Sequence, residues 1–276
     1  MTGLHRSGTT LTCHLLNKVN NTVALHEPMK FGFAKGATKQ QICNEISEFF
    51  ASSRKEILQN KKVLTKHVNG SVPDNIFGEK KNNNGLRMNL TDDKNRMFIP
   101  IENDLTEDFT LCIKHNVLFA LLLNELTALF PCYAIIRNPL AILASWNSVD
   151  LPINNGHIPV AENIDQELSQ KLNSMPDKID RQFYILSWFF RHYKQALPRE
   201  NIIRYEDIIA SRGSSLQIIV PDAIKLSEPL INKNLNQLYD RKLMSSLGER
   251  LLITKGDFWD FYTHEDVKEM LSEITE

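Results

Sequence analysis

Cysteine is scarce in this chain of 276 residues, and the four that are present form no recognised motif. None belongs to a Cys-x-x-Cys pair or has a histidine at the spacing of a zinc ligand, which excludes the common zinc and thiol redox motifs. All four stand among apolar neighbours, so we expect buried thiols. They are Cys13, Cys43, Cys112 and Cys132.

The chain also lacks a long hydrophobic run and a sizeable net charge. Its longest apolar stretch, residues 117–130, is interrupted by Asn124 and Glu125 and is too short to cross a bilayer, so we expect no transmembrane segment. The formal charge of −1 creates no general positive field, which argues against a nucleic-acid partner. Since no cationic and apolar leader precedes the first motif, we expect a protein of a reducing compartment, the cytoplasm.

Apolar residues make up 42% of the sequence, enough to bury the core of one large domain. From Phe109 onward, short continuous apolar runs alternate with segments of helical spacing. This alternation is typical of a parallel sheet that helices cover on both faces. We therefore predict a single domain over residues 1–276, with a three-layer α/β/α architecture and a central parallel sheet of the P-loop nucleotide-binding type.

Individual elements follow from apolar spacing and from the positions of proline. The predicted strands are Thr22–Leu25, Val63–Thr65, Leu111–Ile113, Tyr133–Ile136 and Asn201–Tyr205. The predicted helices are Thr9–Asn17, Lys39–Asn60, Val117–Leu129, Pro139–Val149, Asp177–Ala196, Asn232–Met244 and Glu265–Ile274. Residues 69–108 are rich in Asn, Asp, Lys and Gly, so we expect an insertion made mainly of loops. Such a segment is compatible either with substrate specificity or with a solvated excursion.

Residues 3–10, Gly-Leu-His-Arg-Ser-Gly-Thr-Thr, form a glycine-bracketed loop that leads into a predicted helix. Backbone N–H groups of such a loop converge on an anion, and the helix dipole adds positive potential. The spacing matches a phosphate loop, but Thr9 stands where the Walker A motif has Lys, and the nearest fixed cation is Arg6. Alone, the octapeptide is equally compatible with an ordinary glycine-rich turn. Only Met1 and Thr2 precede the loop, so we expect its usual supporting strand to be missing, through a late start or a loss.

A second motif begins at Arg137, the last residue of a predicted strand. Ser145 follows eight positions later, nearly two turns along the helix that begins at Pro139. A guanidinium and a hydroxyl in this arrangement can hold a phosphate together. The alternative is that Arg137 only caps its helix while Ser145 faces solvent.

Together, these two segments resemble the signature motifs of the sulfotransferases that use 3′-phosphoadenosine-5′-phosphosulfate (PAPS). In that family the first motif holds the 5′-phosphosulfate and the second holds the 3′-phosphate. The donor-binding residues that the resemblance implies are Arg6, Ser7, Gly8, Thr9, Thr10, Arg137 and Ser145. Arg6 stands where the cytosolic phenol and steroid branch has Lys, which resembles the carbohydrate and tyrosylprotein branches.

The resemblance covers most of the chain, including residues 109–114 and 202–207. It does not extend convincingly to residues 69–108 and 211–252, where the choice of acceptor would be encoded. The terminal phosphate loop of the family is only partly echoed at Lys255 and Gly256, which form either part of a cofactor lid or a turn around a buried Trp.

Sulfuryl transfer needs a base for the acceptor proton and cations near the transferred oxygens. Glu27 resembles the catalytic Glu of the carbohydrate and tyrosylprotein branches, and we expect desolvation to raise its pKa. A salt bridge to Arg6 is the alternative role of Glu27, and His26 competes with it as the base. Arg6 and Lys114 are the predicted charge stabilisers, although Lys114 is also compatible with a surface lysine.

The resemblance thus implies a PAPS-dependent sulfotransferase that releases 3′,5′-adenosine bisphosphate (PAP), with a carbohydrate or glycan hydroxyl as the acceptor and no metal. Two other classes remain open. A small-molecule P-loop kinase would need the missing loop Lys and Mg²⁺-binding carboxylates. A non-catalytic nucleotide-binding module of the same fold needs neither.

Overall fold

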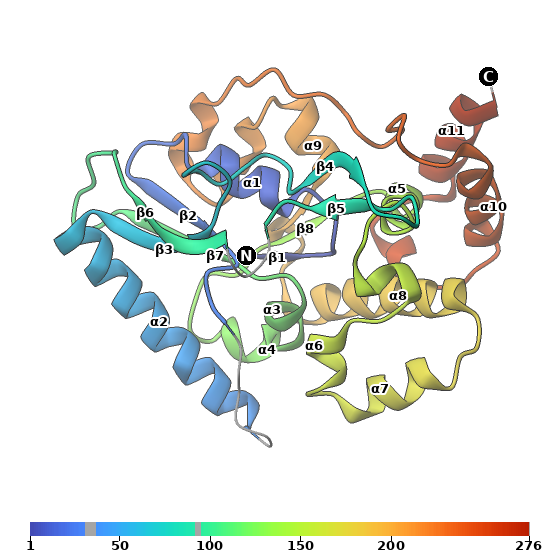
Figure 1. Cartoon of the computed structure of the whole chain (residues 1–276), viewed down its shortest axis with the longest axis horizontal. Helices are drawn as coiled ribbons and strands as arrows, with labels where there is room; N and C mark the ends of the chain where they lie inside the picture. Colours follow the sequence, from blue (N-terminus) through green and yellow to red (C-terminus); the bar gives the residue numbers. More distant parts are fainter. Residues whose placement is uncertain (31–36, 92–94, 276) are drawn as a thin grey trace.

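The computed structural model describes residues 1–30, 37–91 and 95–275. It is a mixed α/β structure in which helices account for about half of the residues and the strands form small sheets. Figure 1 shows the strands gathered at the centre, with the long helices α2 (Lys39–Asn60) and α8 (Lys178–Ala196) along the periphery. None of the described helices combines the length and apolar character needed to span a membrane.

Two small parallel sheets hold the strands that lead to the site. One has the order β1–β8–β9, from strands Thr2–Gly3, Ala134–Ile136 and Ile202–Arg204. The other pairs β2 (Thr22–His26) with β7 (Thr110–Lys114). Met1 joins the two sheets, because its amino group donates to the Ile113 carbonyl at 2.8 Å and its own carbonyl accepts from the His115 N–H at 3.2 Å.

The expectation of a missing first strand is therefore wrong. Thr2 pairs with Ala134 and Gly3 with Ile135, so the loop does follow a strand, though one of only two residues. So short a strand is sufficient because its neighbour β8 has only three residues and all of β1 is buried.

Residues 69–108, expected to be mainly loops, contribute three short strands. β4 (Phe77–Lys81) pairs with β5 (Arg87–Asn89), and β6 (Arg96–Pro100) pairs with β3 (Lys62–Lys66), both in antiparallel fashion. Most side chains of β4 and β6 are exposed or half-buried. β6 contains three consecutive apolar residues, Met97, Phe98 and Ile99, and β4 only Phe77, so neither strand shows the alternation of apolar and polar residues that predicts a half-buried strand.

Several helices lie where the apolar spacing placed them. They are α1 (Thr9–Leu16), α2, α5 (Pro139–Trp146), α8 and α11 (His264–Thr275). The predicted helix over residues 117–129 is instead two short helices, α3 (Val117–Leu121) and α4 (Leu123–Leu126), separated at Leu122. The helices α6 (Pro159–Glu162) and α7 (Gln166–Asn173) were not predicted, whereas α9 (Tyr205–Ala210) opens at the charged residues that end the strand Ile202–Arg204.

The predicted helix over residues 232–244 is wrong in its first half. Helix α10 spans Arg241–Leu252 and is capped by Asp240, whose side chain accepts from the Leu243 N–H. The preceding residues form a loop because asparagine side chains bond to the backbone two residues further on. Asn232 accepts from the N–H of Asn234 and Asn236 from that of Leu238.

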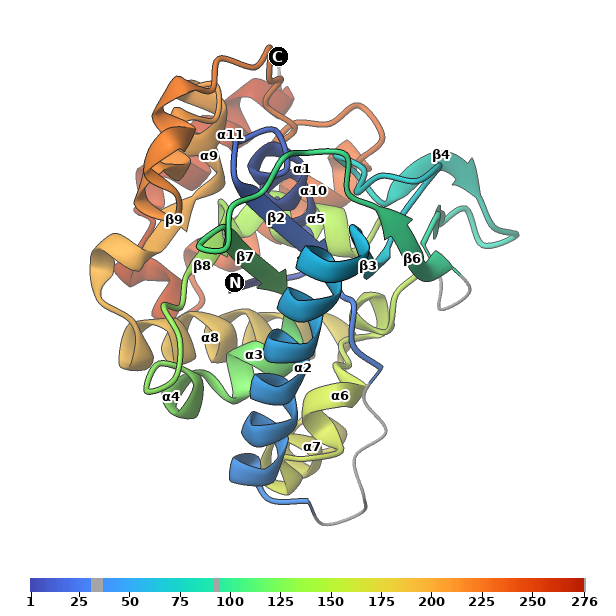
Figure 2. The same ribbon diagram turned by 90° about the vertical axis from the view of Figure 1, so that its left-hand side faces the viewer.

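The parallel strands lie between helices on both sides. Figure 2 shows α1 and α9 on one side of the strands and α3 and α8 on the other. A single large apolar cluster includes Trp146 of α5 and Phe189 and Tyr193 of α8, all fully buried. The indole N–H of Trp146 donates to the His5 carbonyl at 2.8 Å and so ties the glycine-bracketed loop to this core.

Candidate functional site

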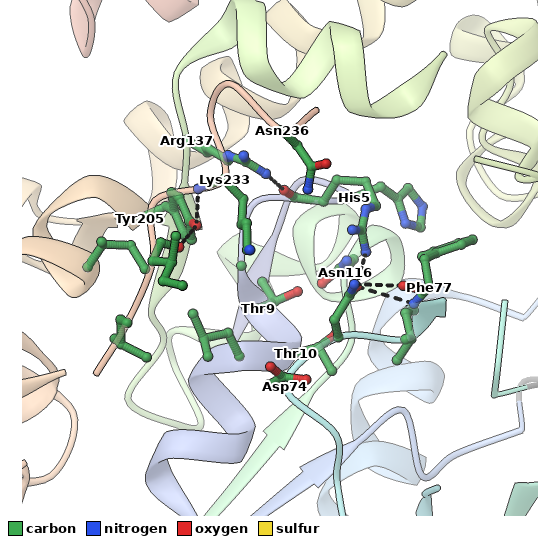
Figure 3. Close-up of a pocket in the computed structure, with 18 of the residues that line it drawn as sticks. His5, Thr9, Thr10, Asp74, Phe77, Asn116, Arg137, Tyr205, Lys233 and Asn236 are labelled. Atoms are coloured by element: carbon green, nitrogen blue, oxygen red, sulfur yellow. Dashed lines mark hydrogen bonds between the residues drawn. The ribbon is translucent and has the colours of Figure 1, made fainter. Parts of the chain in front are cut away.

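A cavity of about 420 Å³ opens where β1, β2, β7 and β8 end. Seven of the residues selected from the sequence line it: Arg6, Gly8, Thr9, Thr10, Glu27, Lys114 and Arg137. Figure 3 shows Arg137, Tyr205 and Lys233 on one side of the cavity and Asn116 and Phe77 on the other. Side chains from distant parts of the chain thus face one space.

The glycine-bracketed loop turns sharply into α1. Gly8 is the N-cap of the helix, with a left-handed φ of 97°, and no side chain caps this end. The first N–H groups of α1 therefore have no partner within the helix, which suits them to an anion. Gly3 is confined as well, because a Cβ there would lie 2.6 Å from the Ile135 carbonyl oxygen. Ser7 braces the loop by donating to the Leu4 carbonyl and lies buried behind the cavity wall.

Arg6 connects the two sequence motifs directly. Its Nε donates to Ser145 Oγ at 3.2 Å, and its Nη1 donates to Asn75 Oδ1 at 3.1 Å. The guanidinium also lies 4.7 Å from the centre of the Phe77 ring. Burial, together with the nearby arginines, lowers the pKa of Arg6 to about 10, so the group remains a cation at neutral pH.

Arg137 is only 4% exposed, yet part of its guanidinium has no partner. Nε donates to Asn234 Oδ1 at 2.8 Å and Nη1 donates to the Arg6 carbonyl at 3.0 Å, whereas buried Nη2 bonds to nothing. The alternative role as a helix cap does not apply, because Asn138 caps α5 through the Leu140 N–H. A buried cation with an unused donor beside a cavity has the chemistry to bind an anion.

Glu27 directly follows β2 and forms two ion pairs. Its Oε1 accepts from Lys114 Nζ at 2.7 Å and its Oε2 from Lys66 Nζ at 3.1 Å. Burial favours a higher pKa for this carboxyl, but Lys114, His26 and Lys66 outweigh it and hold the pKa well below its usual value. The expected rise in the pKa of Glu27 is therefore wrong. Lys114 is 1% exposed and is not a surface lysine.

His26 lies behind Glu27 and does not line the cavity. Its Nδ1 is 3.4 Å from Lys114 Nζ, and its ring is fully buried. Burial and the Lys114 cation lower the pKa of His26 to about 3, so the ring is neutral at physiological pH. His26 thus contacts the lysine that holds Glu27, while Glu27 itself faces the cavity.

Part of the wall comes from residues that the sequence did not single out. Those residues include Asp74, Asn75, Phe77, Arg87, Lys233, Asn236 and Tyr239. Most belong to residues 69–108 and 211–252, the two segments to which the resemblance does not extend. Isolated arginines, asparagines and tyrosines in polar segments carry no periodic signal, so only the folded structure reveals them.

Lys255 and Gly256 lie outside the residues that line the cavity. They precede the short 3₁₀ turn Asp257–Asp260, which is attached to α8 through the Ser187 hydroxyl and Arg191. Buried Phe258 packs so closely that a Cβ on Gly256 would lie 2.1 Å from its ring. In this structure the turn is part of the packing against α8 and forms no lid over the cavity.

Fold and site together define a mixed α/β protein with a cationic cavity at the ends of its parallel strands. Within the described ranges, no three His, Cys, Asp or Glu side chains lie close enough to hold a metal ion. Comparisons with protein-family models, with curated proteins and with solved structures give no match to the chain. The function must therefore be argued from the geometry of the cavity.

Proposed function

We propose that the protein is a sulfotransferase that moves a sulfuryl group from PAPS to an acceptor hydroxyl, on a carbohydrate or glycan. One observation carries the proposal: the uncapped start of α1 and Arg137, whose buried Nη2 has no hydrogen-bond partner, both belong to the wall of the same cavity. Two anion-binding features in one cavity suit a donor with two separate anionic groups. The proposal includes a three-layer fold in which β2, β7, β1, β8 and β9 act as one parallel sheet.

The residues present fit the donor. The N-terminus of α1, with Thr9 and Thr10, would hold the 5′-phosphosulfate, as helix N-termini hold other phosphate groups. Arg137, whose buried Nη2 has no partner, would hold the 3′-phosphate. Ser145 is fully buried outside the cavity wall and would act through Arg6, whose Nε donates to its hydroxyl. Arg6 thus belongs to the first motif and contacts the second through this bond.

PAPS supplies a sulfuryl group attached to a phosphate leaving group. In the transfer, the acceptor oxygen forms a bond to sulfur, the bond from sulfur to the phosphate oxygen breaks, and the acceptor proton passes to Glu27. Lys114, 2.7 Å from Glu27, is placed to stabilise the charge that develops on the leaving oxygen. As Lys114 turns toward that oxygen, Glu27 loses its strongest partner and becomes a better base.

Thermal stabilisation by PAP, compared with ATP and Mg²⁺, tests the proposal. PAP should raise the melting temperature of the wild type, and ATP with Mg²⁺ should raise it less. A kinase would give the reverse order, because ATP with Mg²⁺ is its substrate. We do not expect that order, since a P-loop kinase needs a loop Lys and this chain has Thr9 there. If ATP with Mg²⁺ stabilised the protein and PAP did not, the sulfotransferase proposal would be wrong.

Two variants separate binding from transfer. Arg137→Ala should weaken PAP binding because it removes the guanidinium beside the cavity. Glu27→Gln should bind PAP and lose transfer of labelled sulfate to a glycan mixture by at least about 100-fold, as expected for loss of a general base. If Glu27→Gln turned over like the wild type, Glu27 would not be the base.

A further inference from the structure

A third arginine faces the cavity from an element that the sequence motifs do not include. Arg87 lies on β5, is 2% exposed and lines the cavity. Its backbone N–H donates to the Ser148 carbonyl at 3.0 Å, and its Nη2 donates to Ser148 Oγ at 2.8 Å. Strand β5 is thereby attached to the residues that follow α5, the helix that carries Ser145.

The guanidinium of Arg87 is incompletely satisfied. Its Nε is buried and has no hydrogen-bond partner, as is also true of Arg137 Nη2. No salt bridge joins Arg6, Arg87 or Arg137 to a carboxylate anywhere in the described part of the chain. Arg87 and Arg137 are buried and Arg6 is half-buried. Buried cations without a paired carboxylate are costly, and an anion bound among the three arginines would offset this cost.

The three groups also influence one another electrostatically. Burial and the positive charge of Arg137 lower the pKa of Arg87, and Arg87 and Arg137 both act to lower the pKa of Arg6. Tyr239 is the group that most strongly opposes this repulsion in all three. Burial acts to lower the pKa of Arg137, but Tyr239, Tyr205 and Glu206 outweigh it and raise that pKa. Burial acts to raise the pKa of Tyr239, but Arg137 and Arg6 outweigh it and lower that pKa.

We propose that Arg87 completes, with Arg6 and Arg137, a binding site for a tetrahedral oxyanion, either a phosphate monoester or a sulfate. The inference rests on the proposed function for the identity of its natural ligand. That oxyanion is either the 3′-phosphate of the donor, a dianion, or a sulfate ester already carried by the acceptor, a monoanion. A planar guanidinium gives two parallel hydrogen bonds to such a group, which a lysine cannot reproduce.

The test compares Arg87→Ala and Arg87→Lys with Lys81→Ala, which removes one exposed positive charge from the same pair of antiparallel strands. The probes are PAP, 5′-AMP, which lacks the 3′-phosphate, and inorganic sulfate. We expect Arg87→Ala to weaken the binding of PAP by at least about tenfold, which is the loss typical of a charged hydrogen bond. The binding of 5′-AMP should weaken by less than about twofold. Lys81→Ala should leave both affinities unchanged.

Arg87→Lys keeps the charge and guards against a variant that fails to fold. Arg87→Lys should have the melting temperature of the wild type. It should still lose most of the PAP affinity that Arg87→Ala loses. One outcome supports the oxyanion site but assigns its ligand to the acceptor. In that outcome sulfate stabilises the wild type but not Arg87→Lys, and PAP binding is either unchanged in the variant or absent from both proteins. An absence of PAP binding in the wild type would count against the proposed donor only. The inference would be overturned if Arg87→Ala lost equal affinity for PAP and 5′-AMP, or if sulfate bound equally well to the wild type and to the Arg87 variants.

Discussion

Arg6 and Glu27 share a backbone feature that few residues adopt. Their φ angles are 70° and 45°, in the left-handed region that costs an ordinary L-residue ~1–2 kcal/mol. Glu27 directly follows β2, and Arg6 lies three residues after β1. In these two residues the strain lies in a turn that places a charged side chain at the cavity, as is common where geometry serves binding or catalysis.

Comparison of Glu27→Gly with Glu27→Ala isolates this strain. Both variants remove the carboxylate and leave Lys114 without its closest partner, but only glycine adopts a positive φ at no cost. We predict that Glu27→Gly is more stable than Glu27→Ala by ~1 kcal/mol in urea unfolding, while neither transfers sulfate.

Lys61 provides the matched control. It has a φ of 49° as the C-cap of α2, outside the cavity. Lys61→Gly should therefore gain stability over Lys61→Ala by a similar amount and keep the wild-type activity. Equal stabilities for the two Glu27 variants would show that its backbone is not strained.

His26 makes stability depend on pH. Its folded pKa of about 3 is below the value of about 6.5 in an unfolded chain, so the unfolded state takes up the proton first. The contribution of His26 is therefore complete above about pH 6.5 and is lost as the pH falls toward the folded pKa. We predict that His26→Gln loses less stability than the wild type on acidification from pH 7 to pH 4, with a slope shallower by up to ~1.4 kcal/mol per pH unit.

The measurement is urea unfolding at a series of pH values. His264→Gln, at the exposed start of α11, is the control and should follow the wild-type curve. Parallel curves for His26→Gln and the wild type would contradict the prediction.

At the scale of elements, residues 229–239 form the part of the cavity wall that local patterns failed to predict. Helices α2 and α8 were predictable because apolar spacing coincides with Thr38 and Asp177 as N-caps. In residues 232–239, apolar spacing also predicts a helix, but contacts with other parts of the folded protein hold the segment as a loop. Asn234 accepts from Arg137 Nε and donates to Glu206 Oε1, and the Lys233 N–H donates to the Tyr205 hydroxyl.

Asn234→Ala tests whether these bonds hold the segment on the cavity. We predict faster proteolytic cleavage within residues 229–239 and PAP binding weakened about tenfold, since the variant removes two hydrogen bonds to charged groups. Limited proteolysis read by mass spectrometry and a PAP titration provide the measurements. Gln237→Ala, an exposed change on the same segment, should alter neither. Wild-type cleavage in Asn234→Ala would mean that other contacts hold the segment.

Over the whole molecule, the sequence predicted the loop, the second motif and most of the strands that converge on them. Each of these signals is local: a glycine pair, an arginine before a proline, a short apolar run. The remaining wall could not be predicted because Asn75, Arg87 and Tyr239 reach the cavity only through contacts between distant segments. The single predicted central sheet is likewise present as two small sheets that meet at Met1.

Because the wall is assembled from distant segments, a ligand that fills the cavity should order them together. We predict that saturating PAP slows hydrogen exchange at the start of α1, in residues 74–77 and in residues 229–236 at the same time. A ligand present at 100 times its dissociation constant stabilises the folded state by ~2.7 kcal/mol, enough to slow exchange clearly wherever it closes a local opening. Helix α7 contributes nothing to the wall and should exchange at its unliganded rate. Protection confined to the start of α1 would show that PAP occupies the loop alone and that the other two segments belong to a separate function.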